Sequence, residues 1–330
     1  MREKTATLGN LPISVSNALF DKLVTPILTH NSEISFMDYY LIFHRAKQRA
    51  LQNNVDIAIF YFIDKTPFEK VHLNFCKYSL GTRKTSSNIG VRSELGRLPI
   101  ENFIAQQSVL YLSRLYTDNL NPLLKEAFEL TKSLDSDGVY SWYTYVKQLV
   151  TDEDLKNDVT MCNTSKDLKR IRFKIKNKIS DYYQNFIQCK MEQIGESSKL
   201  LLYKKLEPSF EREFYLSFNE FSIRRIFTKL RISDHNLEIE RGRYNKIPSK
   251  ERHCRTCNAI EDEAHFILKC SKNQNLRKSL FDKILTDYDQ FIYLTDDQKI
   301  KYLLNPKTLR HVRIIGFFFR QSLELRTEGS

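Results

Sequence analysis

The sequence predicts a mainly α-helical protein. Apolar residues recur mostly at the three- and four-residue spacing of a buried helix face, and few segments alternate as strands do. Only nine glycines and eight prolines are present in 330 residues, which argues against a loop-rich β-protein. Hydrophobic residues make up 41% of the chain, so a core can be buried.

Two apolar stripes near the N-terminus predict the first helices. The second stripe runs from Phe68 to Leu80 and ends at Gly81, which is followed by a polar loop at 82–88. In the first, Pro26 limits how regular the helix can be. The apolar positions of that first stripe are Val15, Leu19, Leu23 and Ile27.

Three further helices are predicted in the first half of the chain, at 103–116, 122–134 and 140–150, joined by short Asp, Asn and Gly connections. Residues 56–62 carry a weak strand pattern, with a buried helix as the alternative. The apolar run 314–319 predicts buried core, because about 18 to 20 apolar residues are needed to cross a bilayer.

Basic residues follow helical segments on an unusually cationic chain. The net charge is +12 and the pI about 9.3, which favours polyanionic partners; a merely solubilising surface is the alternative. Residues 166–178 predict an amphipathic helix with a basic outer face, and 224–231 a second basic helix. The candidate phosphate contacts are Lys169, Arg170, Arg172, Lys174, Lys176, Arg224, Arg225, Lys229 and Arg231.

The cysteines do not resemble a disulfide framework. The N-terminus leads into no apolar signal segment, and no run is long enough to span a membrane. We therefore expect an intracellular protein, nuclear or cytoplasmic, with no membrane partner and with reduced thiols. Three of the six cysteines nevertheless fall within residues 254–270, and this clustering needs another explanation.

The pattern Cys254-x2-Cys257-x7-His265-x4-Cys270 supplies three thiolates and one imidazole, the ligand types that Zn²⁺ prefers. The x2 gap lets one tight turn present two sulfurs. The x4 gap does not fit one face of a regular α-helix, so a helix must start or bend there. Four protein ligands leave no open position, so we expect a structural zinc knuckle. A neighbouring carboxylate, from residues 261–263, is a candidate partner for the ring N–H of His265, with solvated loop charge as the alternative.

The only adjacent pair of aspartates, Asp296 and Asp297, follows Thr295. A threonine before two acids is typical of a helix N-terminus, where the hydroxyl caps and the acids face the dipole. We interpret this pair as a helix start and not as a catalytic metal site.

Five blocks of the sequence occur in a characteristic order: 19–28, 68–77, 93–99, 224–244 and the knuckle itself. Together they resemble the C-terminal part of non-LTR (LINE-type) retrotransposon reverse transcriptases. One departure lies at 30–35, where the Ser-Glu pair lacks its usual neighbours. The resemblance begins downstream of the polymerase palm, so it implies neither polymerase nor endonuclease chemistry and no enzyme activity.

The resemblance implies a thumb-like helical region at 1–100, a basic helical linker at 101–245, a CCHC zinc knuckle at 246–285 and C-terminal helices at 286–330. It also implies weakly sequence-selective binding of RNA, DNA or both, with the oligomeric state left open. Two alternatives are a zinc-stabilised helical scaffold for proteins and a decayed retroelement copy without selected function. Aromatic residues near the basic helices are candidates for base stacking, with burial in the core as the alternative: Tyr182, Tyr183, Phe221 and Phe227.

Overall fold

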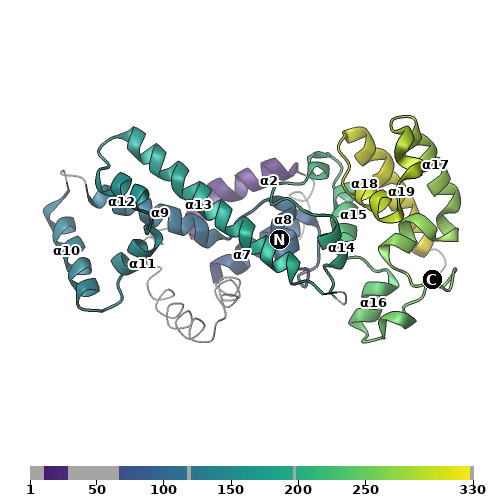
Figure 1. The fold of residues 1–330 in the computed structure, drawn as a ribbon, viewed down its shortest axis with the longest axis horizontal. Helices are drawn as coiled ribbons and strands as arrows, with labels where there is room; N and C mark the ends of the chain where they lie inside the picture. Colours follow the sequence, from purple (N-terminus) through teal and green to yellow (C-terminus); the bar gives the residue numbers. More distant parts are fainter. Residues whose placement is uncertain (1–10, 29–66, 117–119, 196–197, 328–330) are drawn as a thin grey trace. The chain divides into compact units, whose positions relative to one another are not determined.

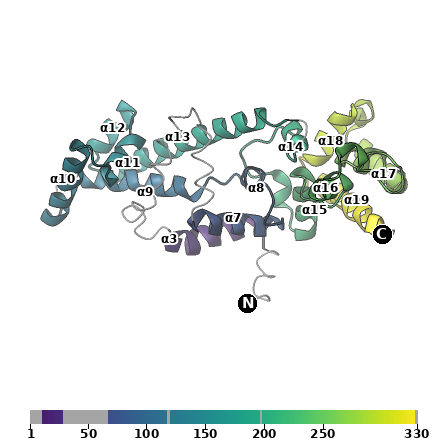
Figure 2. The same ribbon diagram turned by 90° about the horizontal axis from the view of Figure 1, so that it is seen from below.

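The computed structural model describes residues 11–28, 67–116, 120–195 and 198–327. Over these ranges the chain is helical, and the only β-pairing is an isolated antiparallel bridge between His253 and Ile260 (Figures 1 and 2). The predicted mainly α fold is therefore confirmed. No helix in these ranges is both long and apolar enough to cross a membrane. The segments 56–62 and 30–35 lie outside the described residues.

The described residues form two compact units. The helical unit contains 19–28, 67–73, 98–116 and 120–186; the knuckle unit contains 11–18, 74–97, 187–195 and 198–327. Each unit draws on segments that are distant in sequence.

The helical unit is built on α9 (Ile100–Leu115), α10 (Pro122–Ser136), α11 (Trp142–Leu149), α12 (Glu153–Thr160) and the first part of α13 (Ser165–Glu192). α9 contacts α10, α11 and α12 (Figure 1). Their apolar faces and that of α13 form one core, which includes Trp142, Val146 and Ile171. The three helices predicted at 103–116, 122–134 and 140–150 are thus confirmed.

Local capping residues explain where these helices begin. Asn121 accepts a hydrogen bond from the backbone N–H of Leu123, with proline at the first helical position. Ser141 and Thr144 form a reciprocal capping box at the start of α11. Asp152 caps α12, a helix that the apolar spacing alone did not predict.

The N-terminal stripe forms the expected helix but does not supply its buried face. α2 (Ile13–Leu19), the π-turn η1 (Phe20–Val24) and α3 (Thr25–Leu28) follow one another without a break. In the described part of the chain Val15, Leu19 and Leu23 are exposed, and the buried positions are Ile13, Ser16, Phe20 and Thr25. The choice of face was therefore wrong.

α7 (Pro67–Leu80) ends at Gly81, as predicted. Gly81 has φ +67°, and a Cβ there would lie 2.8 Å from the Cζ atom of Phe221. Glycine is required both by this left-handed conformation and by the close approach. α8 (Asn88–Leu95) follows the polar loop and is capped by Ser87.

The knuckle unit contains α14 (Leu201–Lys205), η2 (Phe214–Ser217), α15 (Phe221–Arg231), α16 (Glu238–Tyr244), α17 (Gln274–Leu285), α18 (Asp296–Leu304) and α19 (Leu309–Thr327), with short turns η3 (Ser249–Glu251), η4 (His265–Lys269), η5 (Ser271–Asn273) and η6 (Asp289–Tyr293). α15 and α17 both pack against α19. The apolar run 314–319 is buried there through Ile315, Phe318 and Phe319, which confirms its prediction as core.

The aspartate pair begins a helix, as predicted. The Thr295 hydroxyl accepts from the backbone N–H of Gln298, and the Gln298 side chain accepts from the backbone N–H of Thr295. Asp296 and Asp297 occupy the first turn of α18.

A buried guanidinium links four elements of the knuckle unit. Arg231 is fully buried, and its Nε lies 2.9 Å from Oε1 of Glu94 on α8. Its Nη2 lies 2.6 Å from Glu213, and its Nη1 donates to the carbonyl of Leu304 on α18 at 2.8 Å. Tyr215 of η2 donates to Glu94. Removing any one partner would leave charge inside the protein.

Burial raises the pKa of Glu213 from 4.5 to about 7; Arg231 opposes this rise, and Glu94 adds to it. The folded protein therefore binds a proton at Glu213 that the unfolded chain releases, and stability falls as pH rises from about 4.5 to about 7.

We predict that Glu213→Gln flattens this pH dependence, because the amide keeps an acceptor for Arg231 but does not titrate. Urea unfolding at pH 5 and pH 8 should show the wild type losing about 2 kcal/mol more than the variant. The exposed neighbour Glu211, substituted in the same way, should behave as the wild type. Identical profiles for wild type and Glu213→Gln would contradict the assignment.

Candidate metal centre and cationic surfaces

A tight turn presents the first two cysteines. The backbone N–H of Cys254 donates to the carbonyl of Ala259 at 2.7 Å, and the N–H of Asn258 donates back to Cys254 at 2.9 Å. Asn258 adopts φ +52°, a conformation that asparagine tolerates better than most residues. The bridge between His253 and Ile260 closes the loop beneath this turn.

A π-helical turn presents the other two ligands. η4 spans His265–Lys269, and the N–H of Cys270 donates to the carbonyl of His265 at 2.7 Å. This five-residue hydrogen bond is the π pattern. A π-turn places residues that are five positions apart on the same side, whereas an α-helix does so for residues four positions apart. The bend expected from the x4 gap is thus a π-turn.

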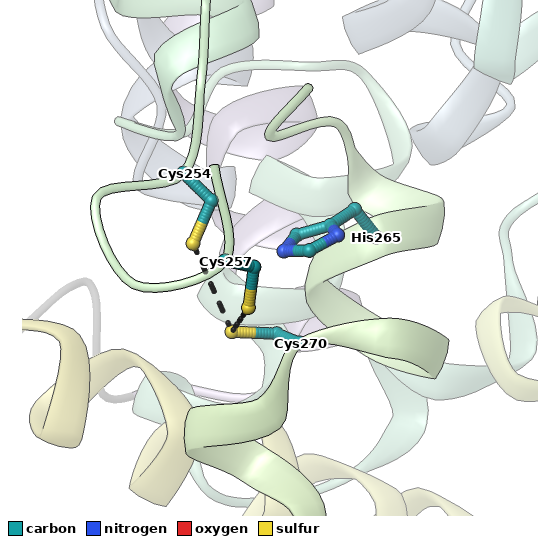
Figure 3. Close-up of side chains that lie close together, drawn as sticks. All are labelled: Cys254, Cys257, His265 and Cys270. Atoms are coloured by element: carbon teal, nitrogen blue, oxygen red, sulfur yellow. Dashed lines mark hydrogen bonds between the residues drawn. The ribbon is translucent and has the colours of Figure 1, made fainter. Parts of the chain in front are cut away.

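The four side chains converge on one point (Figure 3). One ligand atom from each lies within 4.8 Å of the others, and Sγ of Cys270 lies 4.0 Å from that of Cys254 and 3.9 Å from that of Cys257. A disulfide needs about 2.05 Å, so these thiols are free. Tetrahedral thiolates at about 2.3 Å from a zinc ion would lie about 3.8 Å apart. The cluster therefore has the dimensions of a metal site.

His265 adds an orphaned polar atom that fits the same role. Its ring points toward the thiols (Figure 3), and its buried Nε2 has no hydrogen-bond partner in the described part of the chain. A buried imidazole nitrogen without a partner is costly unless something else satisfies it. A metal ion coordinated by the cluster would do so.

The acidic loop does not serve the ring of His265. Asp262 accepts from the backbone N–H of His265 at 2.7 Å. Glu261 accepts from Arg326, and Glu263 lies 2.7 Å from both Ser233 and His235. The prediction that one of these carboxylates pairs with the ring of His265 is therefore not supported. The alternative, that they are solvated loop charges, is not supported either, because all three acids bond to other parts of the knuckle unit.

Burial controls the protonation of the ligands. It raises the pKa of the Cys270 thiol to about 11 and lowers that of His265 below its usual value. Burial also acts to raise the pKa of Cys257, but hydrogen bonds from the Ser271 side chain and backbone outweigh it, and the pKa is lowered. The imidazole is thus neutral at pH 7, as a metal ligand must be.

An ion pair from the last helix fixes the knuckle. Arg326 on α19 donates to both carboxylate oxygens of Glu261, at 2.8 and 2.7 Å. Glu261 is buried and also accepts from the backbone N–H of Glu238 at 2.7 Å. A bidentate pair of this kind is geometrically specific. It connects the loop between the ligand pairs to α16 and α19.

The predicted phosphate contacts on α13 fall into two groups. Nη2 of Arg170 lies 2.9 Å and Nζ of Lys174 2.6 Å from the carboxylate of Asp158 on α12. The remaining three are exposed and form no ion pair with any described residue: Lys169, Arg172 and Lys176.

On α15 two predicted contacts require correction. Arg224 is buried and donates to the carbonyls of Phe218 and Leu11, and Arg231 is the buried guanidinium described above. Both charges are used inside the protein and are not available to a phosphate. Arg225 is exposed and Lys229 is half-buried, so these two remain candidates.

The aromatic candidates divide in the same way. Tyr183 and Phe227 are buried core, whereas Tyr182 is 59% exposed and Phe221 is half-buried. Sequence reasoning missed Phe173, which is 65% exposed among the cations of α13. The sequence does contain a sign of this exposure, because Phe173 is apolar but does not belong to the apolar stripe of its helix.

No protein-family model, curated protein or solved structure matches this chain. The resemblance to non-LTR reverse transcriptases therefore stays a prediction that depends on the ordered blocks of the sequence.

We predict that the purified protein holds one metal ion per chain and that Cys257→Ser loses it, because three ligands hold a metal much more weakly than four. Metal content by mass spectrometry checks this. Cys189→Ser is the matched control, since Cys189 is an exposed thiol outside the cluster. Equal metal content in Cys257→Ser and the control would refute the site.

We also predict that Arg326→Gln speeds metal loss to a chelator and destabilises the knuckle unit by about 1 to 2 kcal/mol, because Glu261 keeps only part of its compensation. Arg313→Gln, on an exposed position of the same helix, should change neither quantity. Unaltered chelation kinetics in Arg326→Gln would show that the ion pair does not support the site.

Proposed function

We propose that this chain is a zinc-containing nucleic-acid-binding protein, related to the C-terminal part of non-LTR retrotransposon reverse transcriptases. Three thiolates and one imidazole favour zinc over harder cations. Zinc bound by four protein ligands has no open position, so its role is to hold the knuckle folded.

The observation that carries nucleic-acid binding is the exposed cationic face of α13. Lys169, Arg172 and Lys176 are spaced three and four residues apart and so share one side of the helix. They span about 10 Å, the rise of roughly three phosphates along one strand of a duplex. Their charges are not neutralised by acids of the described chain.

Phe173 gives this face a second function. It lies between Arg172 and Lys176 in the sequence of α13, and 65% of its surface is exposed. An exposed phenyl ring costs solvation free energy, and base stacking on such a ring stabilises by about 1 to 3 kcal/mol. Cations beside an aromatic ring are typical of surfaces that bind single strands without sequence preference.

We propose no polymerase chemistry for this chain. The aspartate pair acts at the start of α18, where Thr295 caps the helix. The blocks that resemble reverse transcriptases belong to the region after the palm. We infer that the chain holds nucleic acid and performs no reaction on it.

We predict that the triple variant Lys169→Ala/Arg172→Ala/Lys176→Ala binds single-stranded RNA roughly 100-fold more weakly at about 0.1 M salt, because about three counterion-releasing contacts are lost. The slope of log affinity against log salt should fall by about 2. Filter binding over a salt series measures both.

The control removes equal charge elsewhere, at the exposed positions Lys125, Lys283 and Arg313. It should retain most of the affinity. If control and triple variant weaken alike, net charge and not this face causes binding. If the wild type shows no salt-dependent binding to RNA or DNA, the protein-scaffold alternative gains support.

A further inference from the structure

The knuckle unit contains a second group of cations, at the end of α15. Arg83, in the loop after α7, is held there by Asp234: its backbone N–H and its Nε donate to the carboxylate at 2.9 and 3.0 Å. Its Nη2 donates to the carbonyl of His235 at 2.8 Å. Asp234 itself is bonded to α15 through the carbonyl of Lys229 at 2.7 Å. The guanidinium of Arg83 is thus fixed beside the last turn of α15.

Arg225 approaches the same place from α15. Its Nε donates to the carbonyl of Gly81 at 3.1 Å, and a Cβ on Gly81 would lie 2.9 Å from its Cγ. Its two terminal nitrogens find no acceptor in the described part of the chain. One turn further, at the i+4 position, lies Lys229.

Lys229 is the unexplained member of this group. Its ammonium is half-buried and forms neither a hydrogen bond nor an ion pair with a described residue. Burial lowers its pKa, and the nearby charges of Arg225 and Arg83 lower it further, while Asp234 opposes them. Asp234 is already bonded to Arg83 and lies 3.6 Å from Lys199. One carboxylate therefore serves several cations.

Such a group is costly to hold unless an anion joins it. Like charges one helical turn apart destabilise a helix, and a half-buried ammonium without a partner adds a desolvation cost. The other two arginines of α15, Arg224 and Arg231, are buried and donate to carbonyl oxygens inside the protein. On the same helix Arg225 is exposed and Lys229 is half-buried, so these two cations are the ones left for a ligand.

We propose that Arg83, Arg225 and Lys229 form a phosphate-binding site, and, resting on the proposed function, that it binds one backbone phosphate of the nucleic acid. The terminal nitrogens of Arg225 match two phosphate oxygens, and Lys229, four residues along α15, supplies a point charge. Arg83 closes the site from the loop after α7.

The test uses the full chain and the variant Arg225→Gln/Lys229→Gln. Single-stranded RNA should bind about 25-fold more weakly at about 0.1 M salt, with a salt slope smaller by about 1.4, because two contacts are lost. The melting temperature should equal or exceed that of the wild type, since repulsion between cations is removed. The matched control is Lys278→Gln/Lys283→Gln on exposed positions of α17, which should keep wild-type affinity.

Titration with inorganic phosphate, read from the Arg225 Nε–H signal in a nuclear magnetic resonance spectrum, tests the site without nucleic acid. If the wild type binds RNA and the variant and the control bind it with equal affinity, the phosphate site is overturned. The proposed function is unaffected by that result. Should the wild type fail to bind RNA, a shift of the Arg225 signal with phosphate still supports the site, and no shift overturns it.

Discussion

The buried charge of Arg231 is the constraint on which the knuckle unit depends. One guanidinium without access to water pairs with Glu94, lies 2.6 Å from Glu213 and donates to a carbonyl at the end of α18. These partners come from three separate stretches of the chain, so each must be in place before the charge is compensated. The same arrangement fixes the rotation of α15 about its axis. That rotation decides which cations of α15 face solvent.

Most of the fold could be predicted because helices are specified locally. Apolar spacing located α9, α10 and α11, and the capping residues Asn121 and Ser141 mark their first turns. The buried face of α2 could not be found in this way. Leu19 and Leu23 have the right spacing, but burial depends on which neighbours pack against a helix, and Ser16 is buried where a leucine stripe was expected.

The ligand cluster was predictable for the same local reason, since four side chains within 17 residues can meet without help from the rest of the chain. The cationic surfaces were not. Arg224 and Arg225 are adjacent in sequence, yet one is buried against Leu11 and the other contacts Gly81. No pattern within the helix distinguishes them, because Leu11 and Gly81 are more than 140 residues away in the sequence.

Because of the π-turn at His265, the knuckle should tolerate substitutions in the interval from His265 to Cys270 better than deletions. The hydrogen bond between the backbones of His265 and Cys270 depends on the number of residues between them. It does not depend on the identity of the exposed side chain in that interval, Lys269. Substitution at such a position leaves both side chains in place, whereas a deletion of one residue between His265 and Cys270 removes the five-residue hydrogen bond and requires the turn to re-form as an α-turn. Related chains should therefore share the length of this interval more strictly than its sequence.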